Sequence, residues 1–176
     1  ITTAGVSCGY ISIEESRKKI GRNMVANNAD VPNWMVRKAA LDKPSFDSIV
    51  ASMGRLSNLP VTLDDKSYAL PHVLSSMAAM AARGSKVVFV DYLQLIDAQL
   101  KGETNDTAKV SHIARELKRT AKRLNIALVC LAQLNRASEA GGVRKPRMSD
   151  LRQSGQIEQD ADLIILLHRE DYYHRS

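Results

Sequence analysis

Three short runs of aliphatic residues constrain the fold of this chain more than any other feature. Residues 86–91 read KVVFVD, residues 126–133 read IALVCLAQ, and residues 163–167 read LIILL. A strand buried on both faces shows such an unbroken run, whereas a strand with one wet face alternates apolar and polar residues. Because parallel sheets are covered by helices on both faces, these runs predict a mainly parallel sheet.

Amphipathic segments separate these runs and are predicted to be helices. The clearest covers residues 107–124, where apolar side chains recur at helical spacing and basic side chains occupy the opposite face. The apolar positions are Val110, Ile113, Ala114, Leu117, Ala121 and Leu124. Further short strands are expected over residues 9–13 and 59–65, and residues 163–167 are the expected last strand. The predicted fold class is therefore α/β, with helices on both faces of the sheet.

The composition fits one globular domain and narrows the possible functions. With 176 residues, of which 44% are hydrophobic and 25% charged, the chain can bury a sizeable core. No apolar run approaches the ~18 residues of a membrane span, so no membrane partner is expected. The net charge of +6 permits a polyanionic partner. The two cysteines and four histidines lack metal-site spacing, which argues against a zinc cluster and favours a reducing compartment.

Polar residues stand where three of the expected strands end. Glu14 and Glu15 follow the first strand, Asp91 ends the VVFV run, and Gln133 ends the next strand, shortly before Arg136. Helix capping or a solvated turn would explain any one of these residues alone. Ligands of parallel α/β sheets bind at the carboxyl ends of the strands. Acids on two strands and an amide on a third therefore favour a nucleotide site with Mg²⁺.

Longer motifs resemble those of one family. The motifs are ISIEES at residues 11–16, VVFVDYLQLID at 87–97, LAQLNR at 131–136 and SDLRQSGQIEQDADLIILLHRED at 149–171. In this order they resemble the DnaB-type replicative DNA helicases, and the match covers nearly the whole chain. The resemblance implies a RecA-like P-loop NTPase core that uses ATP and Mg²⁺ and acts in the cytoplasm.

The resemblance also implies roles for individual residues. Glu14 would be the general base that polarises the attacking water, and Asp91 would hold the Mg²⁺ of MgATP at the end of a Walker B strand. Gln133 would read the γ-phosphate and couple hydrolysis to movement of the DNA-binding loop. Arg136 would help to bind the nucleotide.

Residues of the long motif at 149–171 would contact DNA. By the resemblance, Arg152, Gln153 and Gly155 would hold the backbone of single-stranded DNA in a central channel, without reading its bases. The full-length protein would form a hexameric ring with ATP bound between subunits. A primase and a helicase loader are the other partners that the resemblance implies.

Two parts of the family pattern are not found in the sequence. No G-x-x-x-x-G-K-[ST] motif occurs, so the phosphate-binding loop and the N-terminal helical domain are expected upstream, and the family's arginine finger downstream. Residues 1–176 are therefore expected to be a partial motor domain, a fragment that does not hydrolyse ATP alone. The divergent residues 30–70 suggest a phage or prophage member of the family.

Two other interpretations remain open from the sequence. The first is a degenerate, non-hydrolysing RecA-like protein that binds single-stranded DNA or has a regulatory role. The second is a RecA-like recombinase, which would form an open filament, although the LRxSGxIEQDAD pattern argues against it. A phosphate-binding loop encoded upstream would distinguish the helicase from the non-hydrolysing protein.

Overall fold

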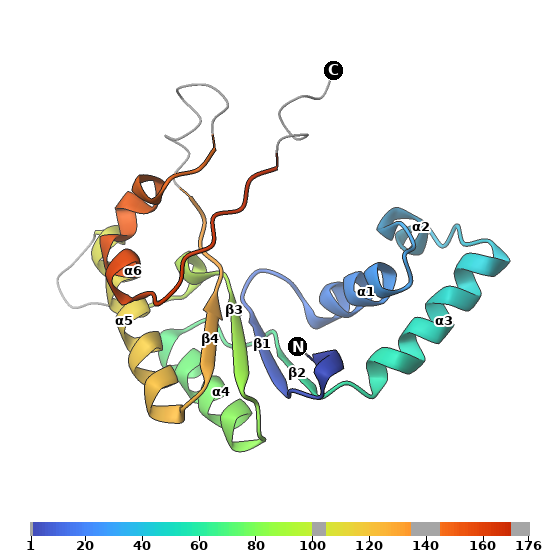
Figure 1. Cartoon of the computed structure of the whole chain (residues 1–176), viewed down its shortest axis with the longest axis horizontal. Helices are drawn as coiled ribbons and strands as arrows, with labels where there is room; N and C mark the ends of the chain where they lie inside the picture. Colours follow the sequence, from blue (N-terminus) through green and yellow to red (C-terminus); the bar gives the residue numbers. More distant parts are fainter. Residues whose placement is uncertain (1, 100–104, 135–144, 170–176) are drawn as a thin grey trace.

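The computed structural model describes residues 2–99, 105–134 and 145–169, and gives only the backbone for Thr3 and residues 152–156. Its elements are shown in Figure 1. In chain order they are η1 (Thr2–Ala4), β1 (Cys8–Ser12), α1 (Arg17–Asn28), α2 (Asn33–Arg37), α3 (Lys43–Ser57), β2 (Val61–Asp64), α4 (Leu70–Ala82), β3 (Val87–Asp91), η2 (Leu93–Leu95), α5 (Asp106–Leu124), β4 (Ala127–Cys130), η4 (Met148–Ser154) and α6 (Gly155–Asp160). Among the described residues, no helix is both long and apolar enough to cross a membrane.

The described sheet has four strands in the order β2-β1-β3-β4, and every neighbouring pair is parallel. This arrangement confirms the α/β class expected from the unbroken apolar runs. The register pairs Ser12 with Asp91, so β1 and β3 reach the same edge of the sheet. The carboxyl ends of all four strands therefore lie on one side of the domain, where parallel sheets bind their ligands.

Helices α4 and α5 bury one face of this sheet. Ile11, Val88 and Val90 point into a core that they share with both helices, and each of these three side chains has no exposed surface. The packing is close at Gly9, where a Cβ atom would lie only 2.3 Å from the sulfur of Met80. Helix α1 lies over the opposite face, so the predicted cover on both faces is confirmed.

The predicted helix at residues 107–124 is α5, and its apolar stripe faces the core as expected. Val110, Ile113, Ala114, Leu117 and Ala121 are buried. The helix begins where the Asn105 side chain accepts a hydrogen bond from a backbone amide, and it ends at Asn125 in the left-handed conformation. Three side chains of its basic face form ion pairs with acids in the described structure: Lys109 with Asp97, Lys118 with Asp162 and Arg119 with Glu116.

The prediction of a last strand at residues 163–167 is wrong. The segment joins no sheet in the described part of the chain, and Figure 1 draws it as a tube, without a strand arrow. Leu163, Ile165 and Leu167 are 77%, 72% and 84% exposed. A strand requires a neighbour that pairs with its backbone amides and carbonyls. The apolar run has the composition of a strand, but no described strand pairs with it.

Candidate functional site

The ends of β1 and β3 bring two of the predicted site segments together. The backbone amide of Ile13 donates to the backbone oxygen of Asp91 at 2.8 Å, so strand pairing continues to the point where Glu14 follows. The two acids after β1 then have different surroundings. Glu14 is exposed and makes no hydrogen bond or ion pair with the described residues, whereas Glu15 is half-buried and pairs with Lys19.

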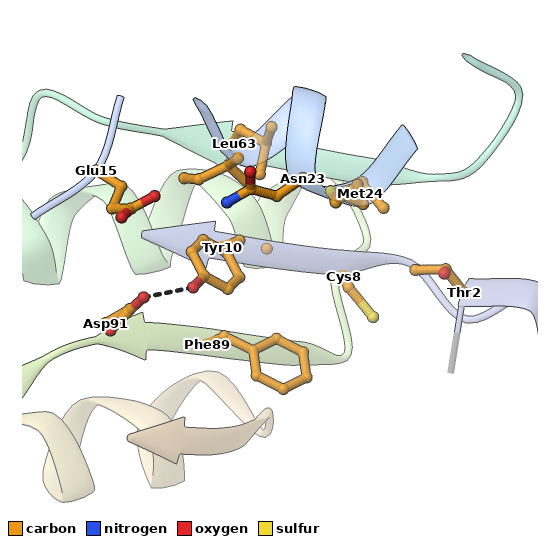
Figure 2. Close-up of a pocket in the computed structure, with 12 residues that line it drawn as sticks. Thr2, Cys8, Tyr10, Glu15, Asn23, Met24, Leu63, Phe89 and Asp91 are labelled. Carbon is orange, nitrogen blue, oxygen red and sulfur yellow. Dashed lines mark hydrogen bonds between the residues drawn. The ribbon is translucent and has the colours of Figure 1, made fainter. Parts of the chain in front are cut away.

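A cavity of about 600 Å³ lies between α1 and the strands β1, β2 and β3. Figure 2 shows Asp91 and Glu15 at the same end of this cavity, with apolar and aromatic side chains along its length. Glu14 is not among the lining residues. Of the two neighbouring acids, the structure therefore places Glu15 in the cavity and leaves Glu14 at the surface outside it.

Tyr10 is a site residue that the sequence reasoning missed. Its phenol oxygen donates to Oδ2 of Asp91 at 2.6 Å, as the dashed line in Figure 2 marks. Burial, reinforced by this hydrogen bond and by the charges of Asp91 and Glu15, raises the pKa of Tyr10 above its ordinary value. The phenol is therefore protonated at neutral pH and acts as the donor.

Gln133 is held at the end of β4 by another residue that the sequence reasoning missed, Gln94. The Gln94 side chain donates from Nε2 to the backbone oxygen of Gln133 at 3.0 Å. It also accepts from the Gln133 amide through Oε1 at 3.2 Å. Just before this point, the Leu93 amide donates to the backbone oxygen of Leu131 at 2.9 Å. Gln94 thus extends the pairing of β3 and β4 beyond the sheet, and leaves the Gln133 side chain exposed.

The remaining predicted residues are less completely described. Arg136 lies outside the described residues. Arg152 and Gln153 fall in η4 and Gly155 begins α6, and for these three residues only the backbone is described. The backbone shows that this segment is anchored to the domain, because η4 and α6 contact α5 and Ile157 packs against the core.

Asp91 fits the requirements of a Mg²⁺ site. Mg²⁺ in nucleotide sites is commonly held by one or two carboxylates, with phosphate oxygens and water completing the shell. Within the described residues, the hydrogen bond from Tyr10 is the only one to the Asp91 carboxylate, so Oδ1 is uncommitted. No group of three or more His, Cys, Asp or Glu side chains gathers as a metal cluster in the described ranges. The uncommitted oxygen of Asp91 and the absence of a larger metal cluster in the described ranges both fit a site in which one carboxylate holds Mg²⁺ together with a bound nucleotide.

Comparison with known families identifies the chain's relatives. Residues 1–176 match the family described as DnaB-like helicase C terminal domain. The chain belongs to this family. The chain is 36% identical over 169 residues to the replicative DNA helicase DnaB of Leifsonia xyli subsp. xyli. This match covers 95% of the chain and 37% of that protein. The chain is 35% identical over 171 residues to a probable plasmid replicative DNA helicase of Chlamydia psittaci, covering 96% and 37%.

Solved structures share the same fold. One of them, an ATPase domain, superposes with a TM-score of 0.91 at 27% identity, covering 99% of this chain and 63% of that chain. The family and this structural match confirm the RecA-like fold and the resemblance drawn from the sequence motifs. The DnaB-like chain spans little more than a third of the length of the curated relatives it matches.

Proposed function

We propose that this DnaB-like chain is part of the ATP-driven motor of a replicative DNA helicase. The protein translocates on single-stranded DNA and unwinds duplex DNA at the replication fork, and it couples ATP hydrolysis at subunit interfaces to movement of DNA-binding loops. The main support is the position of Asp91. Asp91 ends the central strand β3, and its carboxylate faces a cavity. The two strands that flank β3 are β1, which Glu14 follows, and β4, which Gln133 follows.

The three strand ends suggest a division of labour in the nucleotide site. Asp91 holds Mg²⁺, which when bound neutralises charge on the nucleotide phosphates. Glu14 orients the attacking water and accepts its proton, and its exposed carboxylate is uncommitted among the described residues. Gln133 contacts the terminal phosphate from the end of β4, and Arg136 contributes to nucleotide binding. The two hydrogen bonds from the Gln94 side chain hold the Gln133 backbone in position for this contact.

The proposed DNA contacts come from the segment of η4 and α6. Arg152, Gln153 and Gly155 hold the strand backbone, and the net charge of +6 favours such a polyanionic partner. The packing of this segment on α5 links it to β4, the strand that Gln133 follows. The full protein forms a hexameric ring in the cytoplasm and works with a primase and a helicase loader. One structural relative, a DnaB-like replicative helicase with a TM-score of 0.90, is described together with its interactions with primase.

The catalytic assignment is tested by exchanging each neighbouring acid separately. In the protein as its gene encodes it, Glu14→Gln should lower DNA-stimulated ATP hydrolysis by about 10²–10⁴-fold, the usual contribution of a general base. Glu15→Gln is the comparison variant, at the acid that lines the cavity and pairs with Lys19, and it should lower the rate much less than Glu14→Gln does. Activity that survives in Glu14→Gln and is lost in Glu15→Gln would transfer the role to Glu15. If both variants keep full activity, neither acid is the base.

The DNA assignment is tested by the salt dependence of binding. Arg152→Ala should weaken binding of single-stranded DNA and reduce the slope of log K against log salt by roughly 0.7, the value for one phosphate contact. The exposed Lys38, replaced by alanine, controls for the loss of one positive charge elsewhere. An unchanged slope in Arg152→Ala would remove this residue from the DNA contacts.

A further inference from the structure

The register of the sheet brings Tyr10 to Asp91. Tyr10 pairs with Phe89, and Asp91 lies two residues further along β3. Because side chains alternate between the faces of a strand, all three point to the same face, the one that carries the cavity. The rings of Tyr10 and Phe89 stack with centroids 6.2 Å apart, and the phenol of Tyr10 reaches the Asp91 carboxylate.

The contact between Tyr10 and Asp91 has the features of a hydrogen bond that orients a carboxylate. It joins a neutral donor to an anionic acceptor at 2.6 Å, which is the short range expected for such pairs. The hydrogen bond is partly buried, so water competes for it less than at a fully exposed site. Hydrogen bonds of this kind to metal-binding carboxylates orient the ligand and tune its affinity.

We propose that Tyr10 is a positioning residue for the metal site. Its phenol holds Oδ2 of Asp91, so that the carboxylate offers one oxygen, Oδ1, to the ion or its water shell. This inference rests on the proposed role of Asp91 in holding Mg²⁺. Mg²⁺ demands octahedral geometry, whereas Ca²⁺ accepts a carboxylate through both oxygens. Tyr10 therefore raises affinity for Mg²⁺ and disfavours Ca²⁺.

The test measures the binding of a fluorescent ATP analogue to the protein as encoded, as Mg²⁺ is varied. Tyr10→Phe removes one hydroxyl and keeps the stacked ring. It should raise the Mg²⁺ concentration at half-saturation by roughly tenfold. Nucleotide binding in EDTA should not change, and excess Mg²⁺ should restore the rate of ATP hydrolysis. Ca²⁺ should support nucleotide binding relatively better than in the wild type. Tyr68→Phe is the matched control, because Tyr68 is 60% exposed and lies outside the cavity lining.

Two outcomes would overturn the role of Tyr10 alone. The first is an unchanged Mg²⁺ midpoint in Tyr10→Phe while Asp91→Asn abolishes the Mg²⁺ dependence. The second is equal weakening of nucleotide binding with and without Mg²⁺, which would make Tyr10 a general structural support. The variant that combines Tyr10→Phe with Asp91→Asn should bind the nucleotide in Mg²⁺ no more weakly than Asp91→Asn alone, because Tyr10 acts through this carboxylate. If Asp91→Asn itself leaves the Mg²⁺ dependence intact, the metal-site assignment fails, and the inference about Tyr10 fails with it.

Discussion

The pairing between Gln94 and Gln133 gives a prediction that can be worked from individual atoms. One side-chain amide makes both hydrogen bonds to the Gln133 backbone, at 3.0 and 3.2 Å. A hydrogen bond in a folded protein contributes about 0.5–1.5 kcal/mol net, and both of these are exposed to water, which favours the lower part of this range. Together they should stabilise the end of β4 by about 1–2 kcal/mol, which is a factor of about 5–30 in the local opening equilibrium.

Two substitutions separate the two hydrogen bonds. Gln94→Leu removes both, whereas Gln94→Glu removes the donor and keeps an acceptor for the Gln133 amide. Hydrogen exchange at the Gln133 amide, followed by NMR, should accelerate by about 5–30-fold in the leucine variant and by clearly less in the glutamate variant, which keeps one of the two hydrogen bonds. Unchanged exchange in Gln94→Leu would show that the side chain does not hold this segment. Equal acceleration in both variants would show that the donor, not the acceptor, controls it.

Three further predictions concern stability and reactivity. Leu117→Ala, at a side chain only 1% exposed, should lower the free energy of unfolding by about 2–5 kcal/mol in urea titrations, and the more exposed Leu95→Ala by clearly less. Burial alone would raise the pKa of Asp64, but hydrogen bonds from two serine hydroxyls and two backbone amides outweigh it and hold this pKa below its usual value. Its stabilising contribution should therefore be complete above about pH 4 and decline as the pH falls through the lowered value, and Asp64→Asn should flatten this acid dependence of the unfolding free energy. Burial raises the pKa of the Cys130 thiol to about 12 and Cys8 is buried, so Ellman's reagent at pH 8 should label both slowly until the protein is unfolded; rapid labelling of the native protein would contradict this.

The unbroken apolar runs predicted the sheet because they reflect a strong and local constraint. Val88 and Val90 have no exposed surface, and such positions accept only aliphatic side chains without strain or unpaired polar groups. At residues 163–167 the same pattern predicted a strand, and this prediction was wrong. Composition reports the propensity of a segment, whereas strand formation depends on a neighbour that the segment itself does not encode.

Tyr10 and Gln94 were missed for a related reason. Their partners lie 81 and 39 residues away in the chain, so no local spacing reveals the contacts. A signal for Tyr10 was present, because a phenol inside an apolar strand normally needs a hydrogen-bond partner. The partner could have been identified only from the register of β1 against β3. The strand ends themselves were predictable, since parallel pairing brings all carboxyl ends to one edge.

The two faces of the sheet explain why the site lies where it does. Under α4 and α5, the strands contribute side chains with no exposed surface, and an ionised carboxylate there would incur a large desolvation penalty. Over the other face, α1 covers β1 and β2 but stops short of β4, where Val129 is 42% exposed. Asp91 and Tyr10 are on this incompletely covered face, so the carboxylate keeps contact with the cavity while the phenol fixes one of its oxygens. The face under α4 and α5 thus contributes the buried core that stabilises the fold, and the cavity on the other face accommodates the charged carboxylate of Asp91.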